Sequence, residues 1–178
     1  MGYMVPKETQ KHEVVGVPRE VEASKGHSAF RGNFCYNFDD RGRVSLPVEF
    51  RDVLLKRGVD RVVLTNFISQ GARCLEGFDA ISWAEFEGKL KEKSRFNSKI
   101  QRLENFYLSR ASECVVDKVG RILVPSYLRE YASLEKEVTF TSSVYGFRLW
   151  NTRVWGVVFS EAEQALLENP DTFSDVDI

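Results

Sequence analysis

The body of this chain lacks histidine and is poor in cysteine. Its two histidines, His12 and His27, lie near the amino terminus, and its three cysteines, Cys35, Cys74 and Cys114, are far apart. No Cys-x-x-Cys pair occurs. These absences argue against a disulfide framework, a histidine–cysteine metal site, and Ser-His or Cys-His catalysis. Because Cys35 and Cys114 lie in apolar segments typical of strands, we expect buried free thiols there.

The chain also lacks a long hydrophobic run. No apolar segment approaches the roughly 20 residues that cross a bilayer, so no membrane partner is expected. Residues 1–29 contain charged side chains throughout and no apolar core, which argues against a signal peptide and predicts a cytoplasmic protein. The same residues show neither helical nor strand periodicity, and we expect a disordered N-terminal extension over 1–29.

A strong excess of one charge is missing as well, since the net charge is −1. That value averages unlike segments. Residues 155–178 hold six acids and no Lys or Arg, so removing them changes the balance from −1 to +5. The segment 83–110 has seven basic residues against four acids. A mildly basic body with an acidic tail is compatible with a nucleic-acid partner.

One short motif occurs twice in the chain, 78 residues apart. Residues Phe38–Pro47 return as Val116–Pro125, with the shared pattern apolar-Asp-x-x-Gly-Arg-apolar-x-apolar-Pro. Arg51 recurs in the same register as Arg129. An internal repeat of this kind predicts one small structural unit that is built twice.

The predicted elements divide the chain around this repeat. We expect a first unit at 33–82, a helical connector at 83–110, a second unit at 111–154, and a C-terminal helix with an acidic tail at 155–178. Each unit should contain a strand, the glycine turn, a short strand, a helix opened by proline, and a strand pair. Units of 45–50 residues have marginal cores, so the two should bury their sheets against each other. The predicted class is α+β, with two pseudo-equivalent halves.

Two capping signals predict where the connector helices begin. Ser82 with Glu85, and Ser98 with Gln101, follow the capping-box spacing. The apolar residues that follow each box have helical spacing, which favours helix–helix packing over a ligand pocket.

The repeated turn has residue types suited to base recognition. Each copy carries an aspartate, a glycine and an arginine: Asp39, Gly42 and Arg43, and Asp117, Gly120 and Arg121. The glycine can adopt positive φ at little cost. The carboxylate, four residues before the arginine, can fix the guanidinium in one orientation. An oriented arginine can present two parallel donors to guanine O6 and N7, which discriminates by about 1–3 kcal/mol per base.

A simpler interpretation stays open at this point. A surface Asp–Arg pair that only stabilises its turn contributes little. Duplication alone also explains a repeated structure, so the pattern by itself does not name a function.

Several segments together match a known family pattern. They are Phe30-Arg31-Gly32, Asp39–Pro47, Ala111–Cys114, Asp117–Arg121, Lys136–Val138 and Leu149-Trp150. Through them the chain resembles, over about residues 30–160, the MraZ family of bacterial transcriptional regulators, which are built from two SpoVT-AbrB-type units. The residues before Phe30 are not part of that pattern.

The resemblance implies a fold, an assembly and a function. The fold would be a swapped-hairpin barrel of the AbrB kind with flanking helices, and copies would assemble into a homo-oligomeric ring. The ring would bind repeated sites on double-stranded promoter DNA and repress the division and cell-wall gene cluster, including its own promoter, as a nucleoid-associated protein. The implied DNA contacts are Arg43 and Arg121, with Arg41 and Lys118 on phosphates, Asp39 and Asp117 orienting the arginines, and Gly42 and Gly120 in the turns.

Two other classes of function compete with a DNA-binding regulator. An oligomeric protein-interaction or assembly module that has lost DNA binding would fit the weak net charge and the acidic tail. An enzyme fits worst, because the body lacks histidine, a phosphate-binding glycine loop and an activated nucleophile. Neighbouring acids such as Asp39 and Asp40 rarely do acid–base work. We therefore expect no cofactor, no metal and no small-molecule substrate.

Overall fold

The computed structural model describes residues 29–176, in which the same order of elements occurs twice. The first half consists of β1 (Asn33–Asn37), β2 (Arg43–Ser45), α1 (Val48–Arg57), β3 (Arg61–Ser69) and β4 (Ala72–Asp79). The helices α2 (Ala80–Lys91) and α3 (Ser98–Phe106) and the 3-10 turn η1 (Leu108–Arg110) follow. The second half consists of β5 (Ser112–Val115), β6 (Arg121–Leu123), α4 (Ser126–Tyr131), β7 (Glu137–Ser142) and β8 (Phe147–Asn151). It ends in α5 (Thr152–Glu168) and α6 (Thr172–Asp175).

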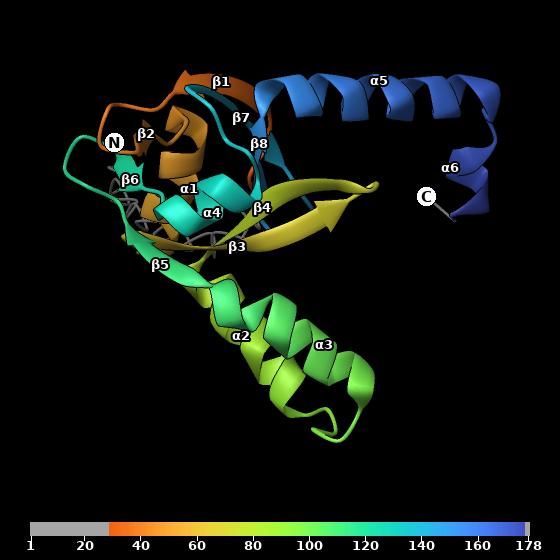
Figure 1. The fold of residues 1–178 in the computed structure, drawn as a ribbon, viewed down its shortest axis with the longest axis horizontal. Helices are drawn as coiled ribbons and strands as arrows, with labels where there is room; N and C mark the ends of the chain where they lie inside the picture. Colours follow the sequence, from red (N-terminus) through yellow and green to blue (C-terminus); the bar gives the residue numbers. More distant parts are fainter. Residues whose placement is uncertain (1–28, 177–178) are drawn as a thin grey trace, which may run out of the picture.

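The strands form a six-stranded sheet in the order β1-β7-β8-β4-β3-β5 and a two-stranded ribbon of β2 and β6 (Figure 1). All pairs are antiparallel. Together with the helices, these sheets confirm the α+β class. The predicted N-terminal extension lies, apart from residue 29, outside the described residues.

The two halves exchange strands. The first strand of each half pairs with the third strand of the other, β1 with β7 and β5 with β3. The short strands β2 and β6 pair with each other, and β4 pairs with β8. Each half therefore completes the sheet of the other, which explains how two undersized units share one core.

Equivalent residues of the two halves meet in that core. The side chains that are 0% exposed include Val44, Leu46 and Phe50 and their equivalents Ile122, Val124 and Leu128. Phe50 packs against the rings of Phe30, Phe34 and Phe140 in edge-on arrangements. Burying one such side chain stabilises a fold by about 1.5–3 kcal/mol. The repeat thus supplies the interior symmetrically from both halves.

Two helical arms leave the β body in different directions (Figure 1). In the α2–α3 hairpin, Trp83 and Phe86 pack with Phe78, Leu103 and Tyr107, so the predicted helix–helix packing is confirmed. The hairpin is joined to the sheet by buried polar groups, because the Tyr107 hydroxyl donates to the Glu76 carboxylate. The second arm consists of α5 and α6.

The structure corrects both predicted helix starts in the connector. Asp79, not Ser82, caps α2, since its carboxylate accepts from the N–H groups of Ile81 and Ser82 at 3.0 and 3.1 Å. Asn97, not Ser98, caps α3 by accepting from the Lys99 N–H at 2.9 Å. Short Asp and Asn side chains on extended backbone are strong N-caps. They therefore begin the helices before the serines that the sequence pattern favoured.

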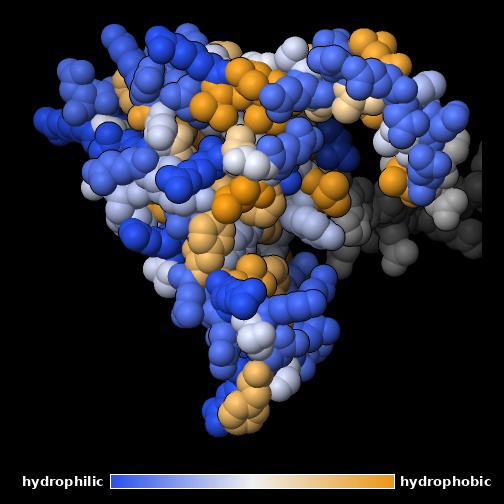
Figure 2. Space-filling model, turned by 45° about the vertical axis from the view of Figure 1, so that its right-hand side comes forward, coloured by the Kyte–Doolittle hydropathy of each residue, from blue (hydrophilic) through white to orange (hydrophobic). Residues whose placement is uncertain are grey.

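The face of the molecule that Figure 2 shows is mainly hydrophilic. Figure 2 shows apolar patches over the β body and at the end of the α2–α3 hairpin, where Phe96 is 81% exposed. Within residues 29–176, no helix has the length and apolar character that crossing a membrane requires.

The three cysteines are free, and one of them contradicts expectation. Cys74 and Cys114 are buried, but Cys35 is exposed. In β1 the side chains alternate, so Phe34 and Tyr36 pack against the core while Cys35 lies on the outer face. Burial raises the pKa of the Cys74 thiol to about 12 and that of Cys114 to about 11. Both are therefore protonated and inert at neutral pH.

This difference predicts selective thiol labelling. In the folded protein at pH 8, iodoacetamide should modify Cys35 much faster than Cys74 or Cys114, and all three should react in denaturant. Peptide mass spectrometry after short labelling measures the site. Fast modification of Cys114 in the folded protein would contradict the burial described here.

Candidate nucleic-acid interface

The first repeated turn is held by its own aspartate. The Asp39 N–H donates to the Arg43 carbonyl at 2.8 Å, and the Gly42 N–H donates to the Asp39 carbonyl at 3.0 Å. The Asp39 carboxylate accepts from the backbone N–H groups of Arg41 and Arg43 at 2.9 and 3.0 Å. Gly42 has φ +79°, as the sequence predicts. The carboxylate therefore organises the turn through the backbone.

The second turn has the same geometry. The Asp117 carboxylate accepts from the backbone N–H groups of Val119 and Arg121 at 3.0 and 2.9 Å. The Gly120 N–H donates to the Asp117 carbonyl at 2.9 Å, and Gly120 has φ +84°. The two turns, far apart in the sequence, thus have nearly the same backbone conformation.

Each aspartate also contacts the guanidinium of its arginine. The Nε of Arg43 lies 2.7 Å from Oδ2 of Asp39. The Nε and Nη2 of Arg121 lie 2.9 and 2.8 Å from Oδ2 of Asp117. The sequence spacing predicted this pairing across the turn.

The ribbon places both arginines on one face. Val44 lies opposite Ile122, and both are 0% exposed. Strand side chains alternate, so Arg43 and Arg121 lie on the opposite, outward face, with 31% and 32% of their side chains exposed. Arg43 faces Leu123 in the register, so the two arginines are diagonal neighbours with Cα atoms about 7–8 Å apart.

An ion pair joins the two turns. Nη1 of Arg121 lies 3.7 Å from Oδ2 of Asp39, so Asp39 contacts the guanidinium of each half. The sequence did not predict this link. An assumed antiparallel pairing of the two repeated short strands would have predicted this contact, because it places the two turns side by side.

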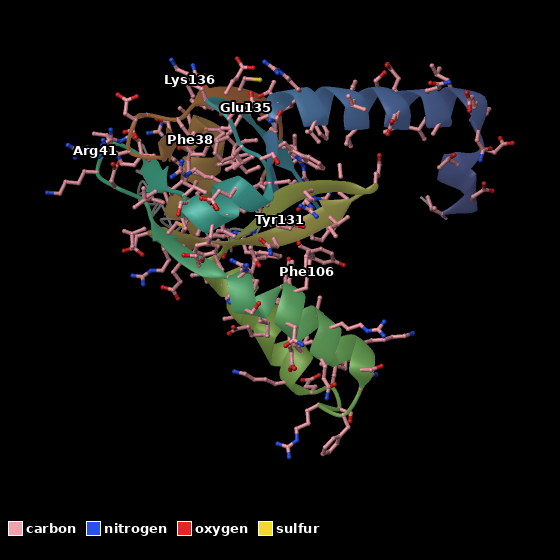
Figure 3. The ribbon with its side chains drawn as sticks, viewed as in Figure 1. Phe38, Arg41, Phe106, Tyr131, Glu135 and Lys136 are labelled. Atoms are coloured by element: carbon pink, nitrogen blue, oxygen red, sulfur yellow. The ribbon has the colours of Figure 1, made fainter. Side chains whose placement is uncertain are left out.

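The tips of the two turns differ in charge. Arg41 and Lys118 are exposed, and Figure 3 shows Arg41 at the edge of the molecule, at the end opposite to α5. Val119 occupies the position equivalent to Arg41 and is 62% exposed. The site therefore has four cationic side chains and three carboxylates, the latter from Asp39, Asp40 and Asp117.

A second pair of arginines lies behind the turns, and sequence reasoning did not assign them a role. A Cβ built on Gly42 would lie 2.9 Å from Cζ of Arg129, and one on Gly120 would lie 2.5 Å from Nη1 of Arg51. Their recurrence in register was the available signal.

Hydrogen bonding lowers the pKa values of both aspartates. The backbone N–H of Arg43 is the main cause that lowers the pKa of Asp39 from 3.8 to about 2, with its guanidinium and the Arg41 N–H contributing, against a smaller opposing effect of desolvation. The pKa of Asp117 is lowered by the equivalent contacts to Arg121. Both carboxylates are therefore ionised, and can hold the arginines, at neutral pH.

Little else in the described residues is suited to small ligands. An open groove of about 500 Å³ lies beside the second turn, lined among others by Arg51, Leu55 and Lys118. Residues 29–176 contain no group of three or more His, Cys, Asp or Glu side chains arranged to hold a metal ion.

Comparison with known proteins identifies the family. The family model described as "MraZ protein, putative antitoxin-like" matches twice, at residues 29–106 and 107–175. The chain belongs to the MraZ family. Each match in this MraZ-family protein covers one half of the strand-exchanged body with its helical arm.

Curated relatives support the assignment over most of the chain. A protein of Halothermothrix orenii is 33% identical over 149 residues, which cover 84% of this chain and 99% of the relative. A protein of Escherichia fergusonii is 35% identical over 143 residues, 79% of this chain and 93% of the relative. One of Desulforamulus reducens is 36% identical over the same length, 79% of this chain and 96% of the relative. All three are named "Transcriptional regulator MraZ".

The lowered pKa of Asp39 predicts a pH-dependent contribution to stability. Because its folded pKa of about 2 lies below the unfolded value of 3.8, the contribution is present above about pH 4 and is lost as pH falls towards 2. Asp39→Asn should therefore lower the urea concentration at the unfolding midpoint at pH 7. Near pH 2 the same substitution should lower this midpoint much less.

The exposed neighbour Asp40 provides the control. Asp40→Asn removes a carboxylate from the same turn and should change the midpoint little at either pH. An equal deficit of Asp39→Asn at pH 7 and pH 2 would contradict the linkage to ionisation.

Proposed function

We propose that this chain is a sequence-specific DNA-binding transcriptional regulator. The single observation that carries the proposal is the β2–β6 ribbon, which presents Arg43 and Arg121 on one exposed face with a carboxylate beside each guanidinium. Family relatives named as transcriptional regulators support it.

The proposed mechanism uses the ribbon as the reading element. The major groove of B-DNA admits a two-stranded ribbon, and arginine is the commonest side chain that reads guanine there. Arg43 and Arg121 contact base edges, and Asp39 and Asp117 orient them. Arg41 and Lys118 contact phosphates, which position a protein on DNA without reading its sequence.

One ribbon per subunit provides modest affinity, so the proposal includes assembly. Copies form a homo-oligomeric ring that binds repeated promoter sites, since linked contacts add far more affinity than one alone. The reciprocal exchange of β1 and β5 supports a swapped-hairpin fold of the AbrB kind. By family resemblance, the target is the division and cell-wall gene cluster, including the protein's own promoter. The effect on these genes is repression, and the protein is associated with the nucleoid. We also propose that the chain is divided into two units, at 33–82 and 111–154. A helical connector at 83–110 joins them, and a C-terminal helix with an acidic tail begins at 155.

An oligomeric assembly module without DNA binding is the second candidate. Exposed apolar side chains on α5, namely Val157, Phe159 and Leu167 at 57%, 54% and 77%, favour protein contacts. A large oligomer with no affinity for the DNA upstream of its own gene would support this candidate.

The first test removes the reading arginines. Arg43→Ala and Arg121→Ala should each weaken binding to upstream DNA by about 5- to 150-fold at fixed salt, the equivalent of 1–3 kcal/mol. Fluorescence anisotropy measures the affinity, and Arg95→Ala, in the exposed end of the α2–α3 hairpin, is the matched control. If both variants bind like the parent protein, the mechanism is wrong.

A second test adds charge where the halves differ. Val119→Arg restores the Arg41 equivalent at the second tip, so DNA affinity should rise and the slope of log affinity against log salt should steepen by about one. Val144→Arg, in the exposed β7–β8 turn, is the control. An unchanged slope for Val119→Arg would show that this tip does not approach phosphate.

A further inference from the structure

Each turn is contacted by an arginine from the other half of the chain. Arg129, from α4 of the second half, lies against Gly42, where an added Cβ would stand 2.9 Å from its Cζ and Nη2. Arg51, from α1 of the first half, lies against Gly120, where an added Cβ would stand 2.5 Å from its Cδ and Nη1. Both glycines leave room for a guanidinium beside the turn.

Backbone hydrogen bonds also connect each turn with the other half of the chain. The Val124 N–H donates to the Gly42 carbonyl at 3.1 Å, and the Leu46 N–H donates to the Gly120 carbonyl at 2.9 Å. Nε of Arg129 donates to the Val124 carbonyl at 3.1 Å. Arg129 therefore contacts both the first turn and Val124, the residue whose N–H binds this turn.

The support is unequal between the halves. Cζ of Arg129 lies 5.8 Å from the centre of the Phe38 ring, directly before the first turn. At the second turn Val116 occupies the position of Phe38, and the buried Nε of Arg51 has no hydrogen-bond partner among the described residues. Arg129 thus has contacts at the first turn, with Val124 and Phe38, that Arg51 does not have at the second.

We infer that Arg129 and Arg51 are positioning residues that act crosswise: each one, from its own half, holds the opposite turn in the shape that presents Arg43 or Arg121 to DNA. This inference rests on the proposed function. It adds two residues that read no base and makes each reading arginine depend on the other half of the chain.

Two simpler roles for Arg129 make different predictions. A residue that only stabilises the fold would weaken every DNA contact alike. A residue that binds phosphate directly would release a counterion, so its loss would reduce the salt slope by about one. A positioning residue changes the contribution of one reading arginine and leaves the salt slope unchanged.

A double-mutant cycle in the full-length protein separates these roles. Arg129→Met should weaken binding to upstream DNA by about fivefold in the parent protein. Combined with Arg43→Ala, which already removes the contact, Arg129→Met should weaken DNA binding no further. Combined with Arg121→Ala, it should weaken DNA binding by about another fivefold. Arg51→Met should show the reverse dependence, with a smaller effect because it has fewer contacts. Neither change should alter the salt slope.

The outcomes distinguish this inference from the proposed function. Equal costs of Arg129→Met in both backgrounds, or a salt slope reduced by one, would overturn the positioning role. If Arg43→Ala and Arg121→Ala leave affinity unchanged, the proposed function itself fails. Should Arg129→Met not fold by circular dichroism, Arg129→Lys replaces it in the same cycle, because it keeps the charge but loses the planar fork that spans Gly42 and Val124.

Discussion

Each half of this chain is too small to bury its own apolar strands, so the halves exchange strands, and this exchange includes the β2–β6 ribbon. At its centre Val44 faces Ile122, both fully buried, and these two residues set which side chains lie on the outward face. A slip of one residue in this register would exchange the two faces and bury Arg43 and Arg121. The contact that completes the core therefore also exposes the two arginines proposed to read DNA.

The same carboxylates serve local structure and the candidate interface. The Asp39 carboxylate accepts from two backbone N–H groups as well as from a guanidinium. Because all of these donors belong to the chain itself, the turn does not need DNA to form. The arginines are oriented in advance, which reduces the side-chain entropy that binding would otherwise cost. An exposed ion pair adds little stability of its own, so its value here lies in geometry.

The sequence predicted what is local and missed what depends on pairing. The repeat predicted the α+β class, the positive φ of Gly42 and Gly120, and the pairing of each aspartate with its arginine. It did not predict that Asp39 contacts Arg121, because that requires the register of two strands far apart in the chain. Cys35 was misassigned because an apolar neighbourhood does not tell which face of an edge strand a residue occupies. Ser82 matched a capping pattern that Asp79 fulfilled three residues earlier.

Arg121 has more carboxylate contacts than Arg43, but two other differences between the halves favour the first turn. Arg41 gives it charge at the tip where the second has Val119, and Phe38 lies beside Arg129 where the second has Val116. The backbone fixes the two turns as near equals, so this inequality resides in side chains alone. A symmetric ribbon would meet DNA equally well in two orientations related by its pseudo-twofold axis. If the ribbon binds DNA as proposed, the unequal tips would make one orientation stronger, so the side-chain differences between the halves would give a nearly symmetric ribbon a direction on DNA.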